Sequence, residues 1–197
     1  IRGKKDYNSR ELSEFYIKAG EKRTRFIINE LNRRIFDLSE MKAIGFCVTI
    51  AHAKYMATQF QQFGIPARAV TNELSAAERA QAIRDLETGE VKVLFSVDIF
   101  NEGVDIPAVN TLLLLRPTQS PVVFLQQLGR GLRLSPGKDS CVIFDFIGQQ
   151  HADFDFERKF RALTRKRGKR LTEEIEQGFP TTPPGSHIQL DQTTTEQ

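Results

Sequence analysis

The chain has 197 residues, a formal charge of +3, 40% hydrophobic residues and 27% charged residues. This length suits one domain with extensions, and the hydrophobic share is ample for a core. The small net charge is no proof of a nucleic-acid partner. No apolar run approaches the ~20 residues of a membrane span, and the opening residues lack the apolar stretch of a signal peptide.

Cysteines and histidines are few and scattered. Cys47 and Cys141 lie in apolar, strand-like runs, so we expect reduced core residues of a cytoplasmic protein. The three histidines show no metal-ligand spacing, and we expect no bound metal in this chain. The sequence opens on Ile1 rather than Met, which is what we expect of a fragment of a longer protein.

The first part of the chain favours helices. Residues 9–38 carry apolar side chains at helical spacing, and Gly20 separates two helices. The two expected apolar faces are Leu12, Phe15, Tyr16 and Ala19, then Ile27, Leu31, Ile35 and Leu38. We expect residues 1–39 to be a helical lead-in to the domain that follows.

After residue 42, short apolar runs alternate with amphipathic stretches. The expected strands are residues 43–48, 67–71, 91–96, 111–117 and 140–148. Thr49 is placed to cap a helix that ends at Gly64 and buries Ala53, Met56, Ala57 and Phe60. Ser75 and Glu78 form a capping box for a helix that ends at Gly89 and buries Ala80, Ile83 and Leu86. Ser120 and Pro121 start a further helix.

This alternation predicts an α/β fold, a three-layer sandwich with a mainly parallel sheet over residues 40–150. Residues 151–197 form a basic helical and Pro-rich extension with a disordered end. Ligands of open α/β sheets bind at the carboxyl ends of the strands. Candidate functional residues are therefore those that follow the strands.

Two segments carry chemical groups of interest. The loop 96–107 holds three acids around a glycine, which suits a ribose or a metal-bound water, although an ordinary turn explains it too. The helix that includes residues 124–134 places Gln126, Arg130 and Arg133 on one face, while Gly129 permits close approach. Guanidiniums match phosphate oxygens in a planar, often bidentate way, although surface salt bridges are the alternative.

These segments together resemble the C-terminal RecA-like lobe of superfamily-two helicases, of the DEAD/DEAH type. Residues 126–133 match Q-x-x-G-R-x-x-R (motif VI), residues 97–107 match motif V, and "GFCVTIAHAKYMA" matches motif IV. The resemblance implies that Arg130 and Arg133 are arginine fingers that act on ATP. It places Gln126, Gly129, Gly103 and Asp105 beside the nucleotide, and it turns the strand ends near Thr49, His52, Thr71 and Ser96 toward nucleic acid.

Some positions depart from the RNA-directed members of the family. Val97 stands where many members have a phosphate-contacting Thr, and Ser96 can supply the hydroxyl instead. Glu102 and "GRGLR" resemble the DNA-directed branch, such as the motors of type I and type III restriction enzymes. DNA is therefore the expected partner, ahead of RNA.

The tail supports two interpretations. Eight basic residues between Arg158 and Arg170 form either a solvated helix face or a phosphate-binding surface that includes Arg165, Lys166 and Arg167. "FDFIGQQHADFDFERKFRALT" and "GFPTTPPGSHIQLD" resemble a segment that follows the motor in a group of bacterial helicases. In that group a phospholipase-D-like nuclease domain can precede the motor.

The chain has neither G-x-x-x-x-G-K-[ST] nor D-E-x-[DH]. ATP and its Mg²⁺ would be held by the family's N-terminal lobe, so we expect the isolated chain to hydrolyse no ATP. The full-length protein would be an ATP-dependent helicase or translocase. The alternative is a non-catalytic nucleic-acid-binding module with a helicase-like fold. A dinucleotide-binding domain is excluded because no G-x-G-x-x-G follows a strand.

Overall fold

The computed structural model describes residues 9–97, 106–117 and 140–146. All of them belong to one compact unit, which comprises Ile1–Pro117 and Gln126–Gly148. The helix begun by Ser120 and Pro121 and the basic extension lie outside the described residues and stay predictions. The domain boundaries predicted at residues 39 and 150 stay predictions as well.

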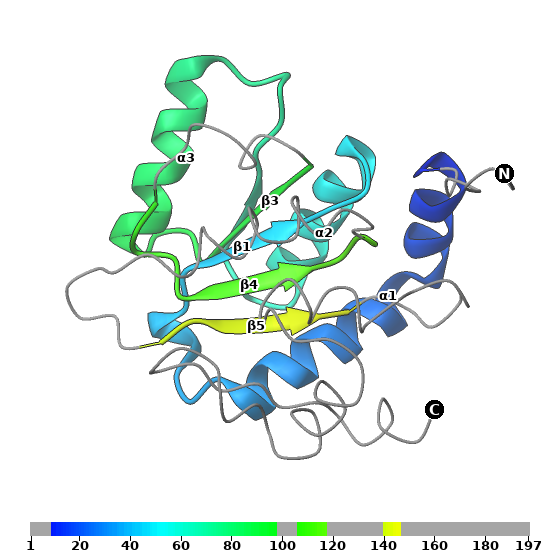
Figure 1. The fold of residues 1–197 in the computed structure, drawn as a ribbon, viewed down its shortest axis with the longest axis horizontal. Helices are drawn as coiled ribbons and strands as arrows, with labels where there is room; N and C mark the ends of the chain where they lie inside the picture. Colours follow the sequence, from blue (N-terminus) through cyan, green and yellow to red (C-terminus); the bar gives the residue numbers. More distant parts are fainter. Residues whose placement is uncertain (1–8, 98–105, 118–139, 147–197) are drawn as a thin grey trace, which may run out of the picture. The chain divides into compact units, whose positions relative to one another are not determined.

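Five parallel strands form one sheet (Figure 1), which confirms the predicted parallel sheet, and their order is β2-β3-β1-β4-β5. The strands are β1 (Ala43–Phe46), β2 (Ala67–Ala69), β3 (Val93–Ser96), β4 (Thr111–Leu114) and β5 (Val142–Asp145). They are shorter than the apolar runs that predicted them. The reason is that residues such as Cys47, Val48 and Leu115 stay buried after the last paired residue of their strand.

Helix α1 (Ser9–Arg34) is two helices joined at a kink, as predicted, because Gly20 has φ 56° and ψ −137°. A positive φ is a conformation that glycine adopts at little cost. The second half buries Ile27 and Leu31 in the core. In the first half Tyr16 is buried as predicted, whereas the prediction for Phe15 is wrong, because Phe15 is 43% exposed.

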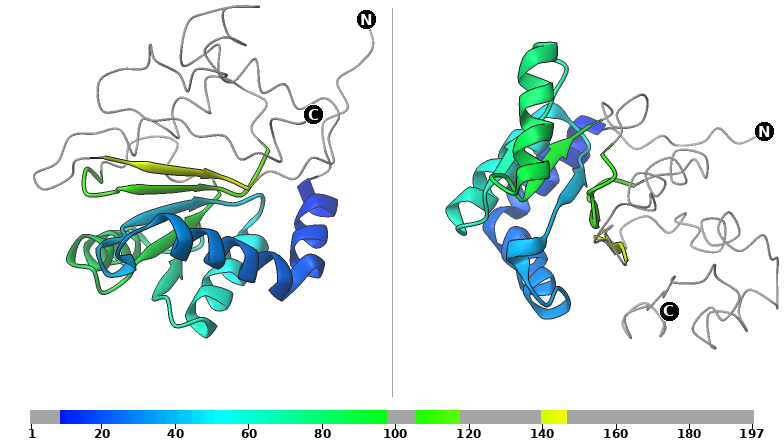
Figure 2. Two further views of the ribbon diagram at one scale, coloured as in Figure 1. Left: turned by 90° about the horizontal axis from the view of Figure 1, so that it is seen from below. Right: turned by 90° about the vertical axis from the view of Figure 1, so that its left-hand side faces the viewer.

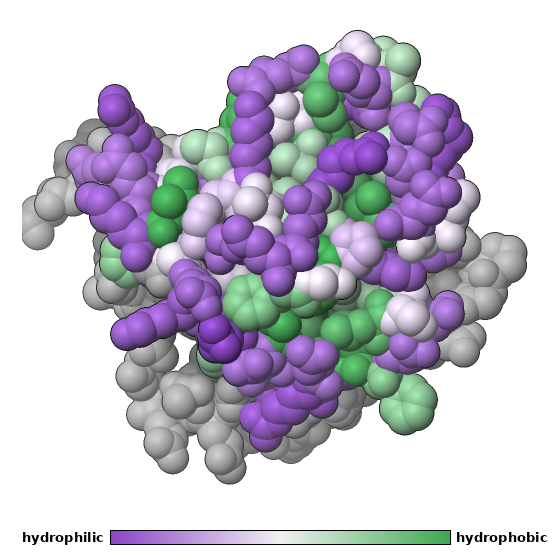
Figure 3. Space-filling model, turned by 180° about the vertical axis from the view of Figure 1, so that it is seen from behind, coloured by the Kyte–Doolittle hydropathy of each residue, from purple (hydrophilic) through white to green (hydrophobic). Residues whose placement is uncertain are grey.

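Helix α2 (Ile50–Gln62) packs with α1 on the same face of the sheet (Figure 2). Its Thr49 cap and the glycine after its end are confirmed, with Gly64 at φ 79°. All four predicted core residues are buried: Ala53, Met56, Ala57 and Phe60. Seen from the side of these helices, hydrophilic residues cover most of the described surface, with apolar patches between them (Figure 3).

Helix α3 (Ala76–Thr88) begins with the predicted capping box and ends at Gly89 in the left-handed conformation. Its predicted face is only partly right, because the buried residues are Ala82, Asp85 and Leu86. The reason is an ion pair of 2.7 Å between Asp85 and Arg68 of β2. Neighbouring residues of a strand point to opposite faces of the sheet, so Arg68 lies on the face opposite to that of the core residue Ala67. Helix α3 therefore covers part of this second face, and the fold has three layers.

Strand β5 is the edge of the sheet and is not buried throughout, contrary to the prediction. Ile143 is 38% exposed because an edge strand has a neighbour on one side only. Cys47 is a buried free thiol as predicted, whereas Cys141 is only half-buried just before this edge. The short 3-10 helix η1 (Leu38–Glu40) leads from α1 into β1. None of the described helices is long and apolar enough to cross a membrane.

Candidate functional site

The predicted nucleic-acid residues gather where the parallel strands end. Thr49 and His52 follow β1, Thr71 follows β2, and Ser96 is the last residue of β3. The arrowheads of β1, β4 and β5 point to the side on which the first half of α1 lies (Figure 1). This end of the sheet, with the first half of α1, is called the carboxyl-end site below.

Thr49 connects three elements of the carboxyl-end site. Its Oγ1 accepts a hydrogen bond from the backbone N–H of His52 at 3.1 Å, which caps α2. The same oxygen lies 2.6 Å from the Ser13 hydroxyl of α1. Thr49 is half-buried, whereas Ser13 is buried. Thr49 is therefore more exposed than the hydroxyl that it contacts.

His52 has an internal role in this structure. The imidazole is 1% exposed, its Nδ1 accepts from the backbone N–H of Val48 at 3.3 Å, and its ring lies 5.2 Å from that of Tyr16. Burial lowers the pKa of His52 to about 3, with a smaller contribution from the charge of Arg23. The ring is therefore neutral at physiological pH, and it fixes the turn that presents Thr49.

Arg23 ties α1 to the end of β5. Its guanidinium lies 4.1 Å from the centre of the Tyr16 ring and donates to the carbonyl of Phe146 at 2.6 Å. A cation over an aromatic face is attractive, more so when both groups are partly desolvated. Burial lowers the pKa of Arg23. The residues Arg23, Tyr16 and His52 thus form a continuous stack from β5 to α2.

Thr71 and Ser96 are buried at the ends of their strands. The Thr71 hydroxyl accepts from the backbone N–H of Glu73 at 3.3 Å and so shapes the turn after β2. The Ser96 carbonyl accepts from the N–H of Cys47 at 2.7 Å. The Ser96 hydroxyl, in contrast, has no hydrogen-bond partner within the described part of the chain. A buried polar group without a partner is costly, so it calls for an explanation.

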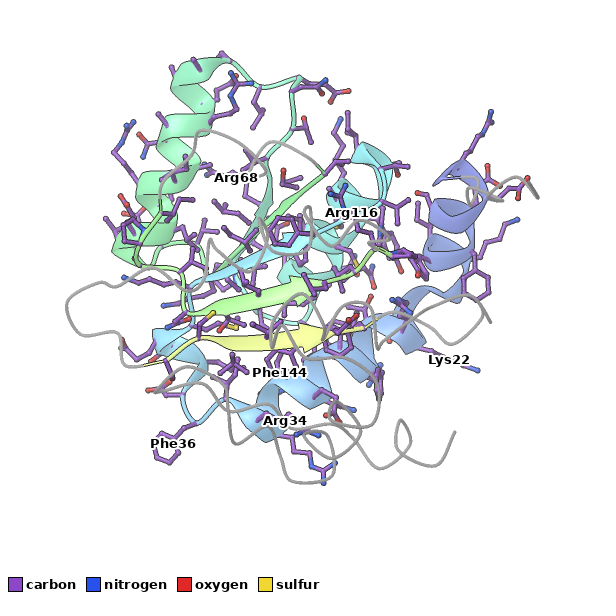
Figure 4. All side chains as sticks on the ribbon, in the orientation of Figure 1. Lys22, Arg34, Phe36, Arg68, Arg116 and Phe144 are labelled. Atoms are coloured by element: carbon purple, nitrogen blue, oxygen red, sulfur yellow. The ribbon has the colours of Figure 1, made fainter. Side chains whose placement is uncertain are left out.

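Sequence reasoning missed four residues of the carboxyl-end site: Ser13, Tyr16, Arg23 and Arg116. Arg116 lies just past β4 (Figure 4), and its charge acts on Cys47, although burial dominates and raises the pKa of that thiol. A cation directly after the buried run 111–115 was a usable signal for it. The other three depend on how α1 bends at Gly20, which no local pattern gives.

The remaining predicted site residues lie outside the described residues, and their roles stay predictions. They are the arginines of motif VI and their neighbours, the glycine and acid of motif V, and the basic residues of the tail: Gln126, Gly129, Arg130, Arg133, Gly103, Asp105, Arg165, Lys166 and Arg167.

Comparison with known protein families identifies the family of this chain. Residues 24–135 match the family described as the helicase conserved C-terminal domain, and the chain belongs to that family. Together with the parallel sheet, this identifies the chain as a C-terminal RecA-like lobe of superfamily-two helicases, as the motifs predict.

Individual relatives agree. The chain is 42% identical over 103 residues to a Saccharomyces cerevisiae protein named as the ATP-dependent helicase IRC3, a match that covers 52% of this chain and 15% of that protein. It spans no more than about a third of the first curated relatives that it matches.

Solved structures show the same fold. The ATP-dependent type ISP restriction-modification enzyme LlaBIII bound to DNA is similar at a TM-score of 0.61 and 22% identity, over 84% of this chain and 13% of that chain. The Escherichia coli DEAD-box protein SrmB is similar at a TM-score of 0.53 and 24% identity, over 64% of this chain and 70% of that chain.

Proposed function

We propose that this lobe completes an ATP site by supplying Arg130 and Arg133 as arginine fingers. ATP and Mg²⁺ are held by an N-terminal RecA-like lobe of the same protein, and Gln126 with Gly129 couples the finger helix to the nucleotide. Gly103 and Asp105 lie beside the ribose. The proposal is supported by the Q-x-x-G-R-x-x-R spacing inside a chain of the helicase family. Fingers of this kind contribute roughly 10³–10⁵ in rate in related enzymes.

The proposed substrate is DNA, along which the motor translocates or unwinds. ATP draws the two lobes together, hydrolysis releases them, and each lobe holds the nucleic-acid backbone in turn. Glu102 and the "GRGLR" segment support DNA over RNA. The two free cysteines fit a reducing, cytoplasmic setting. A nuclease domain upstream of the motor is part of the proposal and rests on the resemblance of the tail.

One observation carries the nucleic-acid side of the proposal: hydroxyl groups with hydrogen-bonding capacity to spare lie at the carboxyl-end site. Thr49 is half-buried, and the Ser96 hydroxyl has no partner among the described residues. Phosphate oxygens are acceptors for such donors. His52 and Thr71 support the same surface from inside by fixing its turns.

The experiment uses the full-length protein. ATP turnover is measured with single-stranded DNA, with single-stranded RNA of the same sequence and with neither, for the parent and for Arg130→Ala. We expect DNA to stimulate turnover more than RNA and Arg130→Ala to abolish the stimulation. Absent turnover, or turnover that does not depend on Arg130, would instead favour a non-catalytic binding module that kept the helicase fold.

The basic tail is proposed as an additional phosphate-binding surface. Each phosphate contact adds to the slope with which DNA affinity falls as salt rises. Replacing Arg165, Lys166 and Arg167 by Ala is therefore expected to flatten that slope by about two to three units. An unchanged slope would assign these residues to a solvated helix face.

A further inference from the structure

Two hydroxyls from distant parts of the chain meet at the carboxyl-end site. Ser13 Oγ of α1 and Thr49 Oγ1 at the start of α2 lie 2.6 Å apart although 36 positions separate them. Ser13 is only 4% exposed, so its hydroxyl is committed to this contact. The contact depends on the kink at Gly20, which turns the first half of α1 against the start of α2.

The hydrogen-bonding capacity of Thr49 decides what this contact can do. A hydroxyl has one proton to donate and two lone pairs to accept with. One lone pair of Thr49 already accepts from the N–H of His52. If Thr49 donates to Ser13, its proton is used inside the protein. If Ser13 donates instead, both Thr49 lone pairs are filled and the Thr49 proton is free for an external acceptor. The geometry admits both directions.

We propose that Ser13 is a positioning residue for nucleic-acid binding: it donates to Thr49, and Thr49 donates to a backbone phosphate oxygen of the bound strand. This inference rests on the proposed function and adds to it a residue that lies outside the motifs. An anionic acceptor beside Thr49 favours the arrangement in which Ser13 donates to Thr49 and Thr49 donates to the phosphate. The reason is that successive hydrogen bonds in a chain polarise and strengthen one another.

The surroundings hold the two hydroxyls in place. Tyr16, about one helical turn after Ser13, packs against His52, which in turn accepts from the N–H of Val48 just before Thr49. The Arg23 guanidinium lies over the Tyr16 ring and donates a hydrogen bond to the carbonyl of Phe146. The turn of α1 that carries Ser13 is thus fixed from both sides, so the Ser13 oxygen is held beside Thr49 before any ligand arrives.

The test is a single-stranded DNA titration of ATP turnover by the full-length protein. Ser13→Ala is expected to raise the DNA concentration that gives half-maximal stimulation by about two- to tenfold, the worth of one hydrogen bond. Turnover at saturating DNA should stay within about twofold of the parent, because Ser13 touches neither ATP nor the fingers. Ser13→Cys keeps a donor, though a weaker and larger one, and is expected to shift the titration in the same direction.

Ser75→Ala is the matched control, since it also removes a single serine hydroxyl, the one that caps α3. It is expected to leave the DNA titration unchanged. A titration unchanged in Ser13→Ala and Ser13→Cys, or shifted equally in Ser75→Ala, would overturn the inference. If Thr49→Val shifts the titration while Ser13→Ala does not, the relay is wrong and DNA binding at Thr49 stands. If DNA fails to stimulate the parent, the proposed function fails first.

Discussion

The two ends of the sheet treat their polar groups differently. At the amino end, Asn110 accepts from the N–H of Lys42 at 2.9 Å and donates to the carbonyl of Glu40 at 2.8 Å. The ammonium groups of Lys42 and Lys92 donate to the carbonyls of Glu87 and Ser39. Each of these side chains closes a turn onto the protein's own backbone.

At the carboxyl end, polar groups are concentrated but not all used. Ser96 has a buried hydroxyl without a partner in the described part of the chain. The Ser13 and Thr49 hydroxyls bond to each other, and this contact uses only one of their two protons. Unsatisfied polar groups cost stability and persist where a ligand uses them. The comparison teaches that the amino end serves the fold, and under the proposed function the carboxyl end gives up stability for binding.

Among the substitutions compared at neutral pH, the largest effect on stability is expected at the amino end. Asn110→Ala leaves the Lys42 N–H, the Glu40 carbonyl and the Thr111 hydroxyl without their partner, so we expect the free energy of unfolding to fall by roughly 1–3 kcal/mol. Urea unfolding measures this loss. The DNA concentration for half-maximal ATP turnover should not change. A shift in that concentration would break the distinction between the two ends.

A second effect concerns pH at the carboxyl end. His52 has a pKa of about 3 in the folded chain against about 6.5 when unfolded, so its proton binds the unfolded state more tightly. Its contribution to stability is complete above pH 6.5 and is lost as pH falls from there toward 3, by up to about 1.4 kcal/mol per pH unit.

The measurement is urea unfolding at pH 7.5, 6 and 5 for the parent and His52→Gln, which removes the titrating group. The parent should lose stability over this range faster than the variant does. Equal slopes would mean that the imidazole is not buried in neutral form.

The smallest effect on stability separates the two ends most clearly. Ser96→Ala removes a hydroxyl that lacks a described partner, so we expect the free energy of unfolding to stay equal or rise by up to about 1 kcal/mol. The DNA requirement for ATP turnover should rise all the same. A variant that is less stable than the parent and binds DNA normally would place Ser96 among the structural residues.

Signals that lie close together in sequence were readable. Thr49 and Gly64 mark the two ends of α2, and the capping box Ser75–Glu78 marks the start of α3. These ends were predictable because caps depend on residues within one turn. The alternation of apolar runs with amphipathic stretches predicted the parallel sheet, because each run is visible in consecutive residues. The motifs around these elements then gave the family.

Contacts between distant residues were not readable. The face of α3 was misjudged because Asp85 is buried by its pairing with Arg68, and no apolar pattern marks such a position. The contact of Ser13 with Thr49 depends on the direction in which α1 bends at Gly20. The sequence predicts a break at that glycine but not the angle between the two halves of α1.

The central claim is that Arg130 acts on ATP bound by another lobe, and a split between binding and chemistry tests it most directly. We would measure ATP affinity and single-turnover hydrolysis, with single-stranded DNA present, for the full-length parent, Arg130→Ala and Arg130→Lys. The account predicts similar ATP affinity in all three and a rate lower by roughly 10³–10⁵ in Arg130→Ala. Arg130→Lys should also be strongly impaired, since an ammonium cannot replace a bidentate guanidinium. Parent-like hydrolysis by Arg130→Ala would contradict the account and leave the chain as a binding module with a helicase fold.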